Sequence, residues 1–289
     1  MRKIIFSLIF CIVLFPTSAL AFANEREVYI ALGDSLAAGQ TPYSQIDAGY
    51  TDYIALQLER HGKLGHFSKE LTFPGYRVGN VIETVQSEKA APLLSEATLI
   101  TLSAGANNLL PLITHNPQQG TIAFNQLNAN FALNEVRTQM GELLSLINAK
   151  APKATVYVLG YYFPYVSVHK EQAEGAVEAV QLLNTILKQE TEAAGYIFVD
   201  VYEAFDQQST TYLPNVADVH PNQLGYRIMA NELLKSYSGN EALILPIDAM
   251  PAPNPKTFEE ILQLQRESAV EEVPYITLHT LDQPIPIFV

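Results

Sequence analysis

The sequence is short of cysteine and of positive charge. Cys11 is the only cysteine among 289 residues, and 30 acidic side chains outnumber 17 basic ones, which gives a formal net charge of −13. A field of this sign repels phosphate backbones and anionic lipid headgroups, so nucleic acids and anionic membranes are poor candidate partners. Phosphate-cradling glycine loops, zinc-spaced histidine pairs and dinucleotide fingerprints are also missing from the sequence. We therefore expect neither a metal nor an organic cofactor.

The first 23 residues have the order of a secretory signal peptide. Arg2 and Lys3 precede an almost wholly apolar run at 4–15, and small-x-small endings follow, the second closing at Ala23. A membrane-spanning helix needs about 20 apolar residues, so a retained anchor is disfavoured. Cys11 lies inside this segment, and its removal would leave no disulfide and no thiolate, which is compatible with export by a bacterium. We expect a secreted or cell-envelope protein without a membrane span.

Strand-like and helix-like stretches alternate after residue 27, and 48% of the chain is hydrophobic, as expected for a folded protein. Such alternation is typical of parallel strands joined by crossover helices. Strands are expected at 28–32, 70–73, 98–102, 154–159 and 196–201, and helices at 50–60, 78–85, 124–149, 171–194 and 222–235. The length allows two domains, but α/β folds often run to about 250 residues as one. We therefore expect one main domain, at 24–240.

The pattern changes near residue 241. Seven prolines fall in the last 49 residues, and only 257–266 keep helical spacing. We expect a proline-rich tail at 241–289 that lies on the domain surface as a strap. A cover over the functional site or a partner-binding segment is the alternative, and the apolar end at 285–289 favours docking on some surface.

One serine lies where an open parallel sheet presents reactive groups. Ser35, in Gly-Asp-Ser-Leu at 33–36, directly follows the first expected strand. A serine hydroxyl is a weak nucleophile until a base takes its proton, so this interpretation requires a histidine with an orienting acid. Among the six histidines, His220 differs because Asp218 precedes it on a loop that opens the last expected helix. Taken alone, residues 33–36 could also be an ordinary strand-to-helix turn.

Four separated blocks stand out along the chain: Gly-Asp-Ser-Leu at 33–36, Phe-Pro-Gly-Tyr at 73–76, Gly-Ala-Asn-Asn at 105–108 and Asp-Val-His-Pro at 218–221. With these blocks in this order, the chain resembles the GDSL lipase/esterase family, also called SGNH hydrolases. The resemblance implies Ser35 as nucleophile, His220 as general base and Asp218 as the acid that orients it. It also implies an oxyanion hole formed by the N–H groups of Ser35 and Gly75 and by the side-chain amide of Asn107. Gly79 is a less favoured candidate for the glycine that donates its N–H.

The resemblance implies a fold and an activity as well. The fold would be a three-layer α/β/α sandwich, flavodoxin-like, with a central and mostly parallel five-stranded sheet, and the activity would be hydrolysis of carboxylic esters. The sequence departs from the family pattern at two positions. The family spaces acid and histidine as Asp-x-x-His, whereas here Ala217 stands three residues before His220. In the third block, Asn108 replaces the family's aspartate. If Asp218 cannot reach the imidazole, a backbone carbonyl could orient the ring instead.

Apolar and aromatic residues follow two of the expected strands and are candidates for substrate binding. Leu109 and Leu110 come directly after the third block, and Tyr162 lies in an aromatic run at 161–165. Such walls suit the acyl chain of a small-molecule or lipid ester, although tyrosines could also stack on the sugar rings of an acetylated glycan. The leading hypothesis is a secreted serine esterase or lipase. The alternatives are a carbohydrate or peptidoglycan O-acetylesterase with the same residues, and a catalytically weak cell-envelope binding protein.

Overall fold

The computed structural model describes residues 26–206, 209–239 and 243–263. The expected signal peptide at 1–23 and the end of the tail at 264–289 lie outside the described residues. Five strands form the central sheet in the order β3-β1-β4-β7-β8, and every pair of neighbours is parallel. The strands are β1 Glu27–Gly33, β3 Leu64–Thr72, β4 Leu99–Ser103, β7 Thr155–Leu159 and β8 Ile197–Val199. The expected parallel sheet is confirmed.

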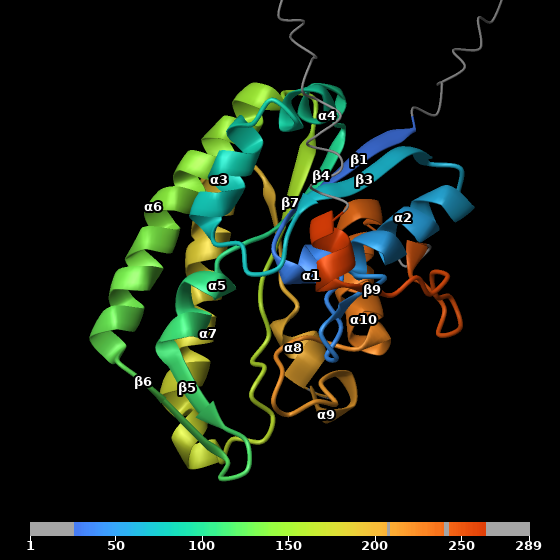
Figure 1. Cartoon of the computed structure of the whole chain (residues 1–289). Helices are drawn as coiled ribbons and strands as arrows, with labels where there is room; N and C mark the ends of the chain where they lie inside the picture. The colour runs from blue at the N-terminus through green and yellow to red at the C-terminus, as the bar shows by residue number, and fades with distance from the viewer. Residues whose placement is uncertain (1–25, 207–208, 240–242, 264–289) are drawn as a thin grey trace, which may run out of the picture.

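Helices cover both faces of this sheet. Figure 1 shows α2 (Tyr50–Arg60) and α10 (Gln223–Ser238) on one face, and α3 (Val78–Gln86), α6 (Gln126–Lys150) and α7 (Lys170–Ala193) on the other. Because both faces are covered, the last five residues of β1 and all of β4 are buried, without the alternation of a strand that has one exposed face. Five short helices complete the connections: α1 Ser35–Ala38, α4 Ala90–Glu96, α5 Ala106–Leu109, α8 Tyr202–Asp206 and α9 Ser209–Tyr212. The result is the expected three-layer α/β/α arrangement.

The sheet has one point where neighbouring strands send their connections to opposite faces. Strand β1 leads to α2, whereas β4, its neighbour, leads to α6 on the other face (Figure 1). In open α/β sheets, ligands bind in the crevice outside the carboxyl ends of the strands at such a switch point. Ser35 directly follows β1, and the block at 105–108 follows β4. The topology therefore brings two of the four sequence blocks to one place.

The structure differs from the sequence expectations in two connections. Strand β3 begins at Leu64 rather than at residue 70, because its first half is a mostly polar, partly exposed edge strand without an apolar run. An antiparallel hairpin of β5 (Ile113–Asn116) and β6 (Thr121–Phe124) precedes α6 and was not expected. Phe124 therefore belongs to a strand, and α6 starts at Gln126, where the side chain of Asn125 caps it by accepting from the N–H of Asn128.

Residues 243–263 lie on the domain. Leu245 is buried, and its N–H donates to Asn231 Oδ1 on α10 at 2.8 Å. Strand β9 (Lys256–Thr257) pairs antiparallel with β2 (Gln45–Ile46), in the loop after α1, and residues 258–263 are helical. Within the three described ranges, no helix combines the length and the apolar character needed to cross a bilayer. The expected boundary between domain and tail at 240–241 stays a prediction.

Candidate active site

A sharp turn after β1 places Ser35 at the start of a helix. Gly33 has φ +129°, and a Cβ there would lie 2.1 Å from the carbonyl oxygen of Ser103 on β4, so a side chain has no room. The N–H of Asp34 donates to that same carbonyl at 2.9 Å. The carboxylate of Asp34 then caps α1 by accepting from the N–H of Leu36 at 3.0 Å. Ser35 is the first helical residue, where backbone N–H groups have no partner within the helix.

His220 connects Ser35 to an acid. Its Nε2 lies 2.8 Å from Ser35 Oγ, although the two residues are 185 positions apart, and its Nδ1 lies 2.7 Å from Asp218 Oδ1. Ser35 and His220 are each 8% exposed, so the pair is largely shielded from water. The structure thus brings together the three residues that the sequence analysis named as nucleophile, base and acid.

A local turn explains how Asp218 reaches the imidazole from only two positions away. Asp218 Oδ1 also accepts from the backbone N–H of His220 at 2.8 Å, which is the bond of an Asx turn. The turn folds the carboxylate back toward the ring. Between the two residues, the carbonyl of Val219 accepts from Tyr162 Oη at 2.7 Å, and the ring of Tyr162 stacks on Phe205 with centroids 4.0 Å apart. The altered spacing therefore leaves the contact between acid and imidazole intact.

The surroundings of Asp218 favour its charged form. Burial raises the pKa of its carboxyl, but the side-chain hydrogen bond of His220, the charge of its ring and the N–H groups of His220 and Val219 lower it. The lowering effects outweigh burial, and the pKa of Asp218 lies below its ordinary value of 3.8. Asp218 is therefore ionised at neutral pH, as an acid that stabilises an imidazolium must be.

A fully buried carboxylate, Asp34, lies beside the site in a hydrogen-bond network that sequence patterns did not identify. Burial raises the pKa of Asp34, while hydrogen bonds from Tyr161, Ser103 and the N–H of Leu36 partly offset this effect. Tyr161 Oη donates to Asp34 Oδ2 at 2.6 Å, and Ser103 Oγ donates to Oδ1 at 2.8 Å. These partners are 127 and 69 positions away in the chain, so only the fold reveals them. The network fixes the turn that carries Ser35.

Asn107 lines the same cavity as Ser35, and its side chain is hydrogen-bonded to the second sequence block, at 73–76. Its Nδ2 donates to the carbonyl of Tyr76 at 2.9 Å, and the second hydrogen on that nitrogen remains for another acceptor. Tyr76 ends a turn in which its N–H donates to the carbonyl of Phe73 and Gly75 has φ +82°, as in a type II turn. Gly75 itself is not among the described residues that line the cavity.

Gly79 and Asn108, the other two residues discussed in the sequence analysis, contribute to the packing and the start of helix α3. Gly79 lies in the first turn of α3, with its Cβ position 3.6 Å from the side chain of Gln139 on α6. Asn108 is buried, and its Oδ1 accepts from the N–H of Val78 at the start of α3. The replacement of aspartate by asparagine therefore keeps an oxygen acceptor at this helix start.

A cavity lined mainly by apolar side chains opens beside Ser35 and His220. All three residues named as substrate-binding candidates, Leu109, Leu110 and Tyr162, line it. Sequence reasoning missed much of the remaining wall, which comes from the β5–β6 hairpin and from α7. The hairpin signal was present, since two short apolar stretches flank a turn with a glycine at residue 120.

Comparison with protein families agrees with this arrangement. The model of the GDSL-like Lipase/Acylhydrolase family matches residues 31–228, a range that contains all four sequence blocks. The fold and this match define a carboxylic ester hydrolase of the three-layer α/β/α class. The chain belongs to the GDSL-like lipase/acylhydrolase family. No curated protein sequence matches it.

Solved structures share the fold at low sequence identity. The lipase Lip_vut3 from a goat rumen metagenome is 21% identical, with a TM-score of 0.58 over 74% of this chain and 98% of that one. An extracellular lipase from Streptomyces rimosus is 20% identical, with a TM-score of 0.53 over 72% and 98%. The acetylxylan esterase Axe2 from Geobacillus stearothermophilus is 17% identical, with a TM-score of 0.56 over 74% and 95%. At these identities the likeness shows the fold alone.

Proposed function

We propose that the protein is a secreted serine esterase or lipase in which Ser35, His220 and Asp218 hydrolyse carboxylic acyl esters. The observation that carries the proposal is the 2.8 Å contact between His220 Nε2 and Ser35 Oγ, in a buried site at the mouth of an apolar cavity. A base within hydrogen-bond reach of a serine hydroxyl, itself bonded to a carboxylate, is the arrangement that activates such a nucleophile.

The geometry supports a two-step acyl transfer. His220 Nε2 takes the Ser35 proton as Oγ attacks the ester carbonyl, and the resulting imidazolium then protonates the leaving alcohol. The N–H of Ser35 and the second hydrogen of Asn107 Nδ2, both at the cavity, stabilise the oxyanion. The N–H of Gly75 as a further donor rests on the resemblance of residues 73–76 to the family's glycine block. Water, activated by His220, then hydrolyses the acyl-enzyme. Asp218 orients the imidazole and stabilises its charged form during both steps.

The proposal that the protein is exported rests only on the sequence of the first 23 residues. Their basic, apolar and small-residue order predicts cleavage near Ala23. N-terminal sequencing of the protein recovered from the medium or the envelope of an expressing bacterium tests this prediction. A start at residue 20–26 is expected, and a start at Met1 contradicts export by a cleaved signal.

The catalytic assignment is tested by hydrolysis of p-nitrophenyl butyrate by the purified protein and its Ser35→Ala variant. We expect wild-type turnover and a loss of at least about 1,000-fold in the variant, because the nucleophile is gone while the oxyanion hole and binding remain. Circular dichroism of both proteins controls for folding. A folded Ser35→Ala protein with the wild-type rate contradicts the proposal. A folded wild-type protein inactive on all esters tried favours the binding-protein alternative.

The O-acetylesterase alternative is supported by the fold shared with an acetylxylan esterase and by the tyrosine rings in the cavity wall, on which sugars could stack. It predicts faster hydrolysis of acetylated xylan or peptidoglycan than of longer acyl esters. Because apolar side chains form most of the cavity wall, we favour the longer acyl esters. Direct comparison of the two substrate classes with one protein preparation distinguishes them.

A further inference from the structure

We propose that the cavity beside Ser35 is an acyl channel along α7, and that Ala176, Ala179 and Phe124 set the length of acyl chain it accepts. This inference rests on the proposed function, because it requires Ser35 as the nucleophile, and it adds the substrate class: esters of linear acyl chains of medium length. Its basis is the course of the cavity, the chemistry of its walls and the position of its far end.

The cavity follows α7 away from the catalytic serine. At the near end, Leu183 lies 3.2 Å from the Cβ position of Gly105, in the loop after β4. Ala176 also lines the cavity and lies seven residues earlier on α7, which is about 10 Å along the axis at 1.5 Å per residue. There the ring of Phe124, on β6, lies 3.6 Å from the Cβ position of Gly175. Figure 1 shows the β5–β6 hairpin beside this end of α7, and its residues Ile113 and Phe124 line the cavity.

Small residues create the space inside the channel. Ala129 on α6 and Ala176 and Ala179 on α7 all line it, and each is buried. Larger side chains at these positions would occupy the volume that a substrate needs. The hairpin adds Ile113 and Phe124 as the opposite wall. The space between α6, α7 and the hairpin is therefore continuous with the catalytic serine.

The walls suit hydrocarbon rather than sugar. The hydroxyl of Tyr161 is bonded to Asp34, and that of Tyr162 to the carbonyl of Val219, so these two residues present their rings to the cavity. A buried sugar would leave its hydroxyls without partners against such walls, which costs free energy. An extended hydrocarbon advances by about 1.25 Å per C–C bond, so the ~10 Å between the two ends accommodates an acyl chain of about eight carbons.

The test is an acyl-length series of p-nitrophenyl esters, from acetate to dodecanoate, with the alcohol held constant. Each methylene buried in the channel is expected to raise kcat/KM about fourfold, up to about octanoate, and longer chains are expected to gain nothing more. A profile that is flat or falls from acetate to octanoate overturns the proposal. Since the leaving group does not change, the profile reports on the acyl side only.

Variants at the far end test which residues set the length. Ala176→Phe is expected to lower the octanoate-to-acetate ratio of kcat/KM at least about tenfold. Phe124→Ala, which opens the end, is expected to move the optimum to longer chains. Ala193→Phe, the same substitution at an exposed position of α7, is the matched control and is expected to keep the wild-type profile.

The outcomes separate this inference from the proposed function. If Ala176→Phe does not fold, Phe124→Ala alone tests the proposed channel. An unchanged acyl-length optimum in Phe124→Ala then overturns the proposal. If a fluorophosphonate probe labels Ser35 but the acyl profile is flat, the channel is wrong and the serine esterase stands. If neither labelling nor hydrolysis occurs in folded protein, the proposed function fails and the channel fails with it.

Discussion

At the residue scale, Asp218 shows what spacing alone can and cannot predict. The four blocks led to Ser35, His220 and Asn107 from the sequence, but the Asp-x-His spacing left open whether Asp218 reaches the ring. Spacing carries no information about the Asx turn, in which one carboxylate oxygen accepts from both the N–H and the imidazole of His220. Tyr161 and Ser103, which donate hydrogen bonds to Asp34, could not be predicted as its partners either, because they belong to other strands and loops.

Asp218→Asn is expected to lower kcat/KM for p-nitrophenyl butyrate at least about 100-fold at pH 7, because the amide neither orients the imidazole correctly nor stabilises its charge. Steady-state kinetics give the value, with Asp200→Asn, at an exposed carboxylate after β8, as the control. A loss of less than about threefold would assign the orienting role to another group, such as a backbone carbonyl.

The same variant carries a prediction for stability against pH. Since the pKa of folded Asp218 lies below 3.8, its ionised form stabilises the fold above that pH, and this contribution is lost as the pH falls through the lowered value. The wild type is therefore expected to be more stable than Asp218→Asn at pH 6, with the difference shrinking below about pH 4. Urea unfolding at several pH values measures it, and a difference independent of pH contradicts the lowered pKa.

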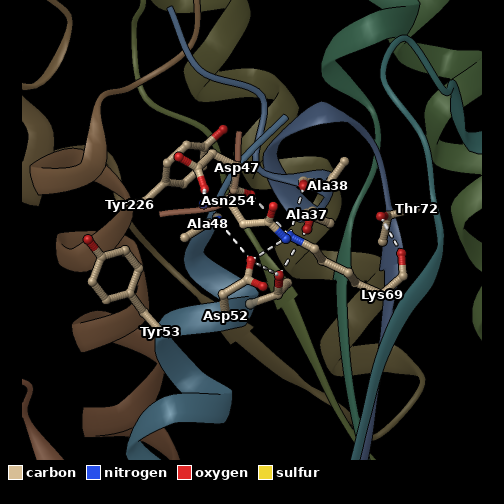
Figure 2. A network of polar contacts seen from close by, with 12 residues as sticks. Ala37, Ala38, Asp47, Ala48, Asp52, Tyr53, Lys69, Thr72, Tyr226 and Asn254 are labelled. Carbon is tan, nitrogen blue, oxygen red and sulfur yellow. Dashed lines mark hydrogen bonds and ion pairs between the residues drawn. The ribbon is translucent and has the colours of Figure 1, made fainter. Parts of the chain in front are cut away.

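At the element scale, one lysine connects the helix that carries Ser35 to its surroundings. Figure 2 shows Lys69, from β3, with its Nζ donating to the carbonyls of Ala38 and Asp47 and to Asp52 Oδ2, at 3.1, 3.1 and 2.6 Å. Ala38 ends α1, and Asp52 also accepts from the N–H of Gly49 at the start of α2. Lys69 therefore fixes both ends of the loop between α1 and α2.

Lys69→Met is expected to reduce the free energy of unfolding by about 2 kcal/mol, because three oxygen acceptors lose a charged donor in a partly buried place. Turnover is expected to fall as well, since α1 carries Ser35. Lys153→Met, at an exposed lysine whose ion pair with Glu96 spans 3.9 Å, is the control. Urea denaturation and p-nitrophenyl butyrate kinetics measure both effects, and equal stability in the two variants contradicts the role given to Lys69.

Elements with strong apolar patterns were predictable, and those with weak patterns were not. The helix expected at 50–60 has those bounds in the structure, and four of the five strands were placed within three residues at either end. The first half of β3 and the short β5–β6 hairpin escaped prediction. At an edge or in a two-stranded hairpin, pairing rather than a continuous apolar run defines the strand. The hairpin matters most, because it forms one wall of the cavity.

At the scale of the whole molecule, the described C-terminal segment at 243–263 packs against the rest of the fold. Leu243, Leu245 and Ala249 join the hydrophobic core, and the N–H of Asn254 donates to Asp47 Oδ1 in the loop after α1 (Figure 2). The sequence predicted a strap here from its prolines, but it gave no contact site. Which surface the strap covers depends on α2, α10 and the α1–α2 loop, whose arrangement only the fold determines.

Leu245→Ala is expected to lower the free energy of unfolding by about 2–4 kcal/mol, the usual cost of a truncated core leucine. Ile247→Ala, two residues on and 78% exposed, is the matched control and is expected to change it by less than about 0.5 kcal/mol. Thermal and urea unfolding of both variants measure the difference. Equal effects would mean that the segment does not pack on the core, and would favour a separate tail.

The central claim is that the fold places Ser35 within hydrogen-bond distance of His220, so that its hydroxyl acts as an activated nucleophile. The most direct measurement is reaction of the folded protein with a fluorophosphonate probe, followed by mass spectrometry of the labelled peptide. The account predicts one adduct, on Ser35, that is lost in Ser35→Ala and strongly slowed in His220→Ala. A folded protein that takes no label, or takes it on another residue at an unchanged rate in both variants, would contradict it.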